Sequence, residues 1–310
     1  MERGLEAPRR QISEQVRLMT GSRRTKAAIR SRREPLLLLG PGVAVLALAF
    51  FLPVFQMLVL SVQVTGADGQ ISFGWDHFAK FFVDDYYLGV SIRTFRLAGL
   101  ITLICFLIGF PLAYVMSRVG PRLRMLLILL VVLPLMTSVV IRTFGWLVIL
   151  GNGGLLSDLL EVIGVTDRAT RLMHTESGIV ISMVQVLVPF MTLTILGVLQ
   201  RIGSDLEQAA RTMGAGFWRA IIGIILPLSL PGIVSGCLIV FALSISSFIT
   251  PTLVGGVRLP VLAGSIYSSV TGSFDWNFAA AQSVLLLLAT LVVIVPYAML
   301  MRRRDTKAVR

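Results

Sequence analysis

The sequence predicts an all-α membrane protein with six transmembrane helices and a helical cytoplasmic loop between the fourth and fifth. Of its 310 residues, 55% are hydrophobic and only 14% are charged, whereas a soluble domain carries about 25% charged residues. Six apolar stretches reach the roughly 20 residues that a helix needs to cross the hydrocarbon core of a bilayer. Basic residues gather in alternate connecting segments, as they do in membrane proteins that follow the positive-inside rule.

Each apolar stretch is expected to form one membrane-spanning helix. The expected spans are residues 36–62, 94–117, 125–150, 178–199, 228–251 and 279–301. Together they form one transmembrane domain, 36–304, between a long basic tail, 1–35, and a short tail, 305–310. The basic tail resembles the start of a signal peptide. However, the apolar run behind it is longer than a signal core and lacks a clear cleavage site, so we expect an uncleaved first span.

The distribution of basic residues sets the predicted orientation. Of the 28 Lys and Arg residues, 21 lie in the two tails and in the loops that follow the second and fourth spans. Both termini and these two loops are therefore predicted to be cytoplasmic. The net charge of +12 follows from this clustering, so it indicates contact with anionic lipid rather than nucleic acid.

Several functions are disfavoured by what the chain lacks. It contains no G-x-x-x-x-G-K-[ST] phosphate loop, so we expect it to bind no cofactor, and active transport would need a separate ATPase. Cys105 and Cys237 are isolated in apolar runs and predict no metal site. No Ser-His-Asp arrangement indicates an enzyme. The spans contain no Asp or Glu, which disfavours an ion-coupled secondary transporter, although that class remains an alternative.

The loop between the fourth and fifth spans contains residues that typically begin and end short helices. Ser204 and Glu207 have the spacing of a capping box, and the apolar spacing continues to residue 213. Gly214 is then expected to end the helix in a left-handed conformation. A second helical piece restarts at Phe217, and Pro227 is expected to separate it from the fifth span. Pattern alone leaves two readings open, an amphipathic connector lying on the membrane or a docking surface.

This loop resembles the EAA motif of ABC transporter permeases of the binding-protein-dependent importer class. The positions that match its spacing are Ala209, Ala210, Gly214, Ile224, Leu226 and Pro227. Gln208 stands where the motif has glutamate, and Glu207 immediately precedes it. The stretches GFPLAYVMSR, LPLMTSVVIRTFGW, SLPGIVSGCLIVFALSISSFITPTLVGG and FDWNFAAAQSVLLLL are similar to spermidine/putrescine-type permeases in particular.

The resemblance implies a permease subunit in a bacterial inner membrane. Its loop would be a coupling helix that docks on the ATPase through Glu207, Gln208, Ala209, Ala210, Gly214, Leu226 and Pro227. The implied partners are an ABC ATPase dimer that uses ATP and Mg, a second, similar but distinct permease, and a periplasmic solute-binding protein. Whether Glu207 or Gln208 replaces the motif glutamate stays open.

Polar and aromatic residues within the spans are candidates for the solute pathway. They are Thr137, Ser138, Arg142, Trp146, Ser246, Ser247 and Thr250. Arg142 is either an arginine that snorkels to the outer interface or part of a gate. The resemblance implies a polyamine as the solute. The absence of carboxylates in the spans keeps amino acids, opines and organophosphonates open as alternatives.

Overall fold

A computed structural model of the chain describes residues 40–65, 70–151, 154 and 172–308, and it separates into two units, Met1–Val59 and Leu60–Arg310. The expected basic tail, 1–35, lies outside the described residues, as do residues 309–310. The first apolar helix is Gly40–Val62, and none of its most apolar 18 residues is buried. The predicted all-α class is confirmed. Among the described residues, five helices are long and apolar enough to cross a membrane, or six if a bent pair counts as one span.

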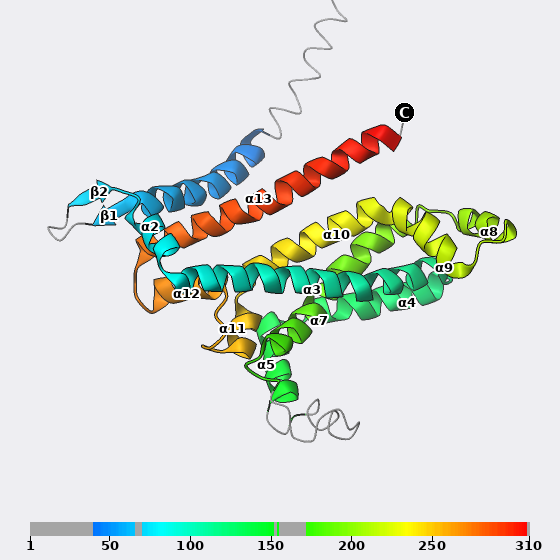
Figure 1. The fold of residues 1–310 in the computed structure, drawn as a ribbon, viewed down its shortest axis with the longest axis horizontal. Helices are drawn as coiled ribbons and strands as arrows, with labels where there is room; N and C mark the ends of the chain where they lie inside the picture. The colour runs from blue at the N-terminus through cyan, green and yellow to red at the C-terminus, as the bar shows by residue number, and fades with distance from the viewer. Residues whose placement is uncertain (1–39, 66–69, 152–153, 155–171, 309–310) are drawn as a thin grey trace, which may run out of the picture. The chain divides into compact units, whose positions relative to one another are not determined.

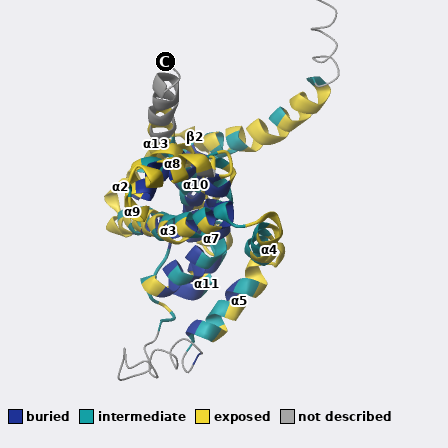
Figure 2. Cartoon of the chain, turned by 90° about the vertical axis from the view of Figure 1, so that its right-hand side faces the viewer, coloured by how far each residue is buried: buried dark blue, intermediate teal, exposed yellow. Residues whose placement is uncertain are grey.

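Three long helices form the core of the second unit. They are α3 (Asp85–Arg118), α7 (Glu176–Leu199) and α10 (Leu226–Ser246), and each packs against the other two (Figure 1). Cys105, Met191 and Ile195 are fully buried where they meet. Buried residues concentrate on α7 and α10 (Figure 2), so α7 is a central helix of this unit.

Short elements cluster at the two ends of this helical core (Figure 1). One end carries an antiparallel hairpin, two short helices and the start of the last helix. These are β1 (Gln63–Thr65), β2 (Ile71–Phe73), α2 (Asp76–Val83), α12 (Leu262–Thr271) and α13 (Trp276–Ala308). The opposite end carries α8 (Ser204–Thr212) and α9 (Phe217–Ala220). The last helix continues to Ala308, so residues 305–308 of the expected short tail are helical.

The expected third span, 125–150, is a bent pair rather than one straight helix. It consists of α4 (Pro121–Val132), a 3-10 turn η1 (Leu133–Met136) and α5 (Val139–Leu150), with a bend of 94° between the halves. The break falls at residues 137–138, where the backbone is extended. Pro134 accounts for the change from α-helix to a 3-10 turn at Leu133, because proline removes a helical N–H donor and crowds the preceding turn.

The fifth span begins earlier than expected and is continuous through Pro227. It runs from Phe217 to Ser246 through a π-helical turn, η2 (Ile221–Ile225), in which the Leu226 N–H donates to the Ile221 carbonyl. Pro227 therefore does not separate the loop from the span. The wider π-turn gives the proline ring room, since proline would otherwise clash with the carbonyl four residues earlier. At the other end the helix stops at Ser246, and α11 (Ile249–Gly255) follows as a separate short helix.

Candidate functional site

The loop between α7 and α10 folds as the sequence predicted at its central bend. Gly214 has a φ of +87°, the left-handed conformation that glycine adopts without strain. The Gly214 N–H donates to the Arg211 carbonyl and the Ala215 N–H donates to the Ala210 carbonyl. These two bonds form the Schellman motif that ends a helix. The bend therefore fixes α8 against the start of α9.

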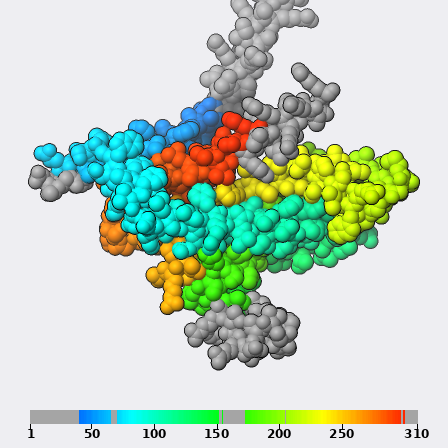
Figure 3. Space-filling model, viewed as in Figure 1, coloured from blue at the N-terminus to red at the C-terminus, as the bar shows by residue number. Residues whose placement is uncertain are grey.

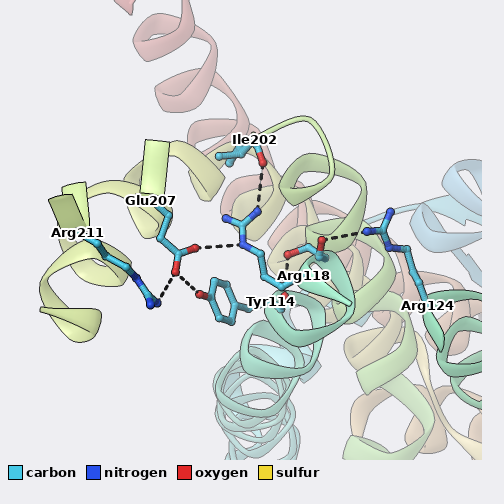
Figure 4. Close-up of polar contacts among 7 residues, drawn as sticks. Tyr114, Arg118, Arg124, Ile202, Glu207 and Arg211 are labelled. Atoms are coloured by element: carbon cyan, nitrogen blue, oxygen red, sulfur yellow. Dashed lines mark hydrogen bonds and ion pairs between the residues drawn. The ribbon is translucent and has the colours of Figure 1, made fainter. Parts of the chain in front are cut away.

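Glu207 is the buried charged group of this loop. Its side chain is 9% exposed, and it points from α8 toward the end of α3 (Figure 4). Oε1 accepts a 2.9 Å hydrogen bond from the Tyr114 hydroxyl and a 2.6 Å bond from Arg211. Oε2 accepts a 3.2 Å bond from Nε of Arg118. A buried carboxylate needs such charge-assisted partners to offset its lost hydration.

This arrangement replaces the expected capping box. Gly203 takes the N-cap position of α8, and both oxygens of Glu207 accept from other side chains instead. Arg211 lies one turn after Glu207 on the same helix, an i, i+4 pair. Tyr114 and Arg118 come from α3, about 90 residues earlier in the chain. The carboxylate thus joins two segments that are distant in sequence.

Aromatic contacts strengthen the same junction. The Arg118 guanidinium lies 5.5 Å from the centre of the Tyr114 ring, and Arg211 lies 5.4 Å from the centre of the Phe217 ring on α9. The rings of Tyr114 and Phe217 meet edge to face at 6.2 Å. Arg118 also donates a 3.4 Å bond to the Ile202 carbonyl just before α8. We call Tyr114, Arg118 and Glu207 the α3–α8 junction, because these side chains connect α3 to α8.

A separate arginine completes the end of α3. Arg124 donates to the Met116, Ser117 and Val119 carbonyls at 3.0–3.1 Å. These are carbonyls that the end of a helix leaves without partners. The turn between α3 and α4 is therefore held beside the α3–α8 junction (Figure 4).

The two alanines of the motif differ in exposure. Ala210 is 2% exposed and packs inside the chain, whereas Gln208 and Ala209 are exposed. Of the residues expected to dock on the ATPase, Glu207 and Ala210 are therefore buried within this chain, whereas Gln208 and Ala209 are accessible. Gln208, at the position of the motif glutamate, points outward, and Glu207 points inward. The half-buried Leu226 and the exposed Pro227 lie on the continuous helix that begins at Phe217.

Large apolar side chains lie exposed among polar ones on the outward side of the loop. Leu206, Met213 and Trp218 are 50%, 82% and 70% exposed. They surround Gln208 and Ala209 in the sequence, and in the space-filling view the α8–α9 segment lies open at the end of the second unit (Figure 3). Exposed apolar side chains of this kind are typical of a contact with another protein or with the membrane surface.

The sequence-based interpretation missed Tyr114, Arg118 and Arg124. A signal for two of them was present, because Tyr114 and Arg118 are one helical turn apart at the polar end of an apolar span. Side chains at i and i+4 share a helix face. A polar pair on one face at the end of an apolar span therefore indicates a contact with a polar segment outside the membrane.

The candidate pathway residues divide into two groups. Trp146, Ser247 and Thr250 each contact a neighbouring helix in the region where α5, α7 and α11 pack together. Trp146 donates to Gln185 at 3.3 Å, Ser247 lies 3.6 Å from the Met183 sulfur, and Thr250 bonds to Thr143 at 3.0 Å.

The other candidate pathway residues do not join this group. Thr137 and Ser138 lie at the break in the third span, and Ser246 is exposed and bonds to its own helix. Arg142 donates a 2.9 Å bond to the Thr137 carbonyl. It therefore caps a carbonyl that the break sets free. Its Nε and Nη1 are buried without a hydrogen-bond partner among the described residues.

Comparison with known proteins identifies the family. The family described as "Binding-protein-dependent transport system inner membrane component" matches residues 105–307. The chain belongs to this family. It is a multi-pass inner-membrane permease of an ABC importer, a transport component rather than an enzyme. A permease of this class works with an ATPase, a binding protein and a second permease.

Individual relatives agree with the family. The chain is 34% identical to "Spermidine/putrescine transport system permease protein PotB" of Haemophilus influenzae over 255 residues, which cover 81% of this chain and 89% of the relative. It is 30% identical to the protein of the same name from Escherichia coli K12 over 256 residues, covering 81% and 92%. Its fold is similar to a chain of a solved structure, a bacterial alginate ABC transporter in complex with an alginate pentasaccharide-bound periplasmic protein. That match has a TM-score of 0.73 and 21% identity, and it covers 88% of this chain and 96% of the other.

Proposed function

We propose that this permease forms half of the pathway for a polyamine of the spermidine/putrescine type, delivered by an external solute-binding protein. The observation that carries the proposal is the similarity to permeases named for spermidine and putrescine along about four-fifths of the chain. The second permease would be a similar but distinct chain. ATP and Mg would be used by two ATPase subunits, because this chain has no phosphate loop.

In this proposal α8 and α9 are the coupling helices. They lie at the end of the core where the basic loops of the chain also lie, which supports a cytoplasmic location for this end and for both termini. Leu206, Gln208, Ala209, Met213 and Trp218 would contact the ATPase. The Gly214 bend would hold the two short helices at the angle that docking requires.

A second candidate solute is anionic or zwitterionic, such as an amino acid, an opine or an organophosphonate. One observation favours it: two buried guanidinium nitrogens of Arg142, Nε and Nη1, have no hydrogen-bond partner among the described residues. A guanidinium attracts carboxylate or phosphonate oxygens and repels a polyamine.

Reconstituted uptake distinguishes these solutes. The permease pair, ATPase and binding protein would be placed in liposomes and supplied with labelled spermidine, putrescine, an amino acid or a phosphonate. We expect polyamine uptake that needs ATP and the binding protein and that survives collapse of the proton gradient. Uptake that stops with the proton gradient would support a secondary transporter instead. Uptake of the phosphonate alone would favour the second candidate.

A further inference from the structure

The α3–α8 junction offers a direct mechanical route from the coupling loop to the second span. We infer that Glu207, through Arg118 and Tyr114, fastens α8 to α3, so that movement of α8 reaches α3 directly and not only through the chain into α10. The inference rests on the proposed docking of α8 on an ATPase. It assigns a positioning role to Glu207 and leaves the partner contact to Gln208.

The burial of the contacts supports a firm attachment. The Glu207 side chain is 9% exposed and that of Arg118 is 20% exposed, so the ion pair is shielded from the screening that weakens surface pairs. The Tyr114 hydroxyl adds a second bond from the same helix. Arg118 also holds the Ile202 carbonyl. The end of α3 therefore binds both α8 and the segment at Ile202 that leads into it.

The alternative route along the chain passes through two interruptions of regular α-helix. From α8 it passes through the Gly214 bend and then through the π-helical turn Ile221–Ile225 before it reaches α10. The Gly214 bend changes the direction of the chain, and the π-turn replaces the regular α-helical hydrogen bonds. A hydrogen-bonded side-chain cluster across to α3 bypasses both features.

α3 is suited to carry such a movement through the whole unit. It is one helix of 34 residues, about 50 Å long at 1.5 Å per residue. It packs along α7 and α10. At its far end Arg96 pairs with Glu176 of α7, and Thr94 accepts a 2.9 Å bond from the Leu262 N–H at the start of α12. A displacement of α3 at Arg118 would thus be transmitted to the opposite end of the unit.

Two arginine variants separate the link to α3 from the stability of α8 itself. Arg118→Gln removes the ion pair between α3 and α8 but keeps the Glu207–Arg211 pair within α8. Arg211→Gln removes the Glu207–Arg211 pair within α8 but keeps the ion pair between Arg118 and Glu207. In the complete transporter we expect Arg118→Gln to lower the solute moved per ATP hydrolysed about fivefold or more, with unchanged co-purification of the ATPase. Arg211→Gln should change that ratio by less than about twofold.

Controls test charge and geometry separately. Asp205→Asn removes a negative charge from an exposed side chain of the same helix, so it should leave the ratio unchanged. Arg118→Lys keeps the charge without the planar guanidinium and should restore part of the loss. Tyr114→Phe removes only a hydroxyl, so it is the replacement test variant if Arg118→Gln lowers expression of the protein. A smaller fall in the ratio is expected for it.

The outcomes distinguish this inference from the proposed function. An unchanged ratio in Arg118→Gln, or in Tyr114→Phe if it replaces that variant, would overturn the inference. Loss of ATPase co-purification in Arg118→Gln would also overturn it, because the residue would then act in docking. The docking itself is tested by Met213→Asp on the exposed side. If that variant still binds the ATPase normally and transports normally, docking at this surface is wrong, whatever Arg118 does.

Discussion

Thr143 of α5 and Thr250 of α11 share a buried hydrogen bond of 3.0 Å although 107 residues separate them in the chain. The Thr143 hydroxyl donates its hydrogen to the Val139 carbonyl at 2.8 Å, so Thr250 is the donor to Thr143. Both residues are 1% exposed. The bond connects α5, the second half of the bent third span, to the short helix that follows the fifth span.

We expect Thr143→Val to lower the stability of the protein by about 1 kcal/mol, because the Thr250 hydroxyl would lose its partner in a buried site. Thermal unfolding in detergent measures this change. Thr290→Val is the matched control, since the Thr290 hydroxyl bonds only within its own helix, and it should have little effect. Additive losses in Thr143→Val, Thr250→Val and the double variant would contradict a shared bond.

The left-handed Gly214 provides a test of the bend between α8 and α9. A side chain here would meet open space, so the cost of Gly214→Val comes from the backbone alone, at about 1–2 kcal/mol. We expect reduced co-purification of the ATPase and reduced ATP-dependent uptake.

Gly216 is the control for this variant, because it also faces open space but has a φ of −66°. Gly216→Val should bind the ATPase normally, and Gly214→Asn should be milder than Gly214→Val because asparagine tolerates the left-handed region. Equal effects at both glycines would show that the bend is not what docking requires.

Close packing of α3 on α7 depends on Gly109. A Cβ at this position would lie 2.9 Å from Cγ of Met191 and 3.2 Å from the Thr192 hydroxyl. We expect Gly109→Ala to destabilise the protein by about 1–3 kcal/mol, the usual range for overpacking.

Gly99 lies on the same helix with open space around it, so Gly99→Ala should be neutral or slightly stabilising. Thermal unfolding compares the two variants. Gly109→Ala in a Met191→Ala background should recover part of the loss. Matching unfolding temperatures for Gly109→Ala and Gly99→Ala would rule out the packing argument.

The proposed orientation predicts which surface residues can be labelled from outside the cell. Val257 and Met213 are 99% and 82% exposed at opposite ends of the second unit. In intact cells an impermeant maleimide should label Val257→Cys, and Met213→Cys only after the membrane is opened. The native Cys105 is buried and Cys237 is half-buried, so the unchanged protein is the background control. Labelling of Met213→Cys in intact cells would show that the orientation is the reverse of the proposed one.

The lack of a phosphate loop predicts that this chain has no ATPase activity by itself. Phosphate release should be at background for the purified permease and should appear only with the ATPase subunits. ATP hydrolysis that co-purifies with the permease in the absence of the ATPase subunits would refute this prediction.

Sequence alone was sufficient for the local features of this protein. The apolar stretches are long enough that their composition determines a membrane-spanning, all-α class. The position of α8 and the bend at Gly214 also follow from nearby residues, because helix ends and left-handed turns depend on local chemistry. The resemblance of the EAA-like stretch led to the family that the comparisons then confirmed.

Only the tertiary structure decided how these helices break, continue and face one another. Hydropathy does not distinguish a straight third span from one bent at residues 137–138, and the π-turn before Pro227 leaves no pattern in composition. The inward direction of Glu207 depends on Tyr114 and Arg118, whose proximity is created by the packing of α3 on α7 and α10. Which of two adjacent residues, Glu207 or Gln208, faces the interior is therefore a property of the folded chain, because contacts between distant segments determine it.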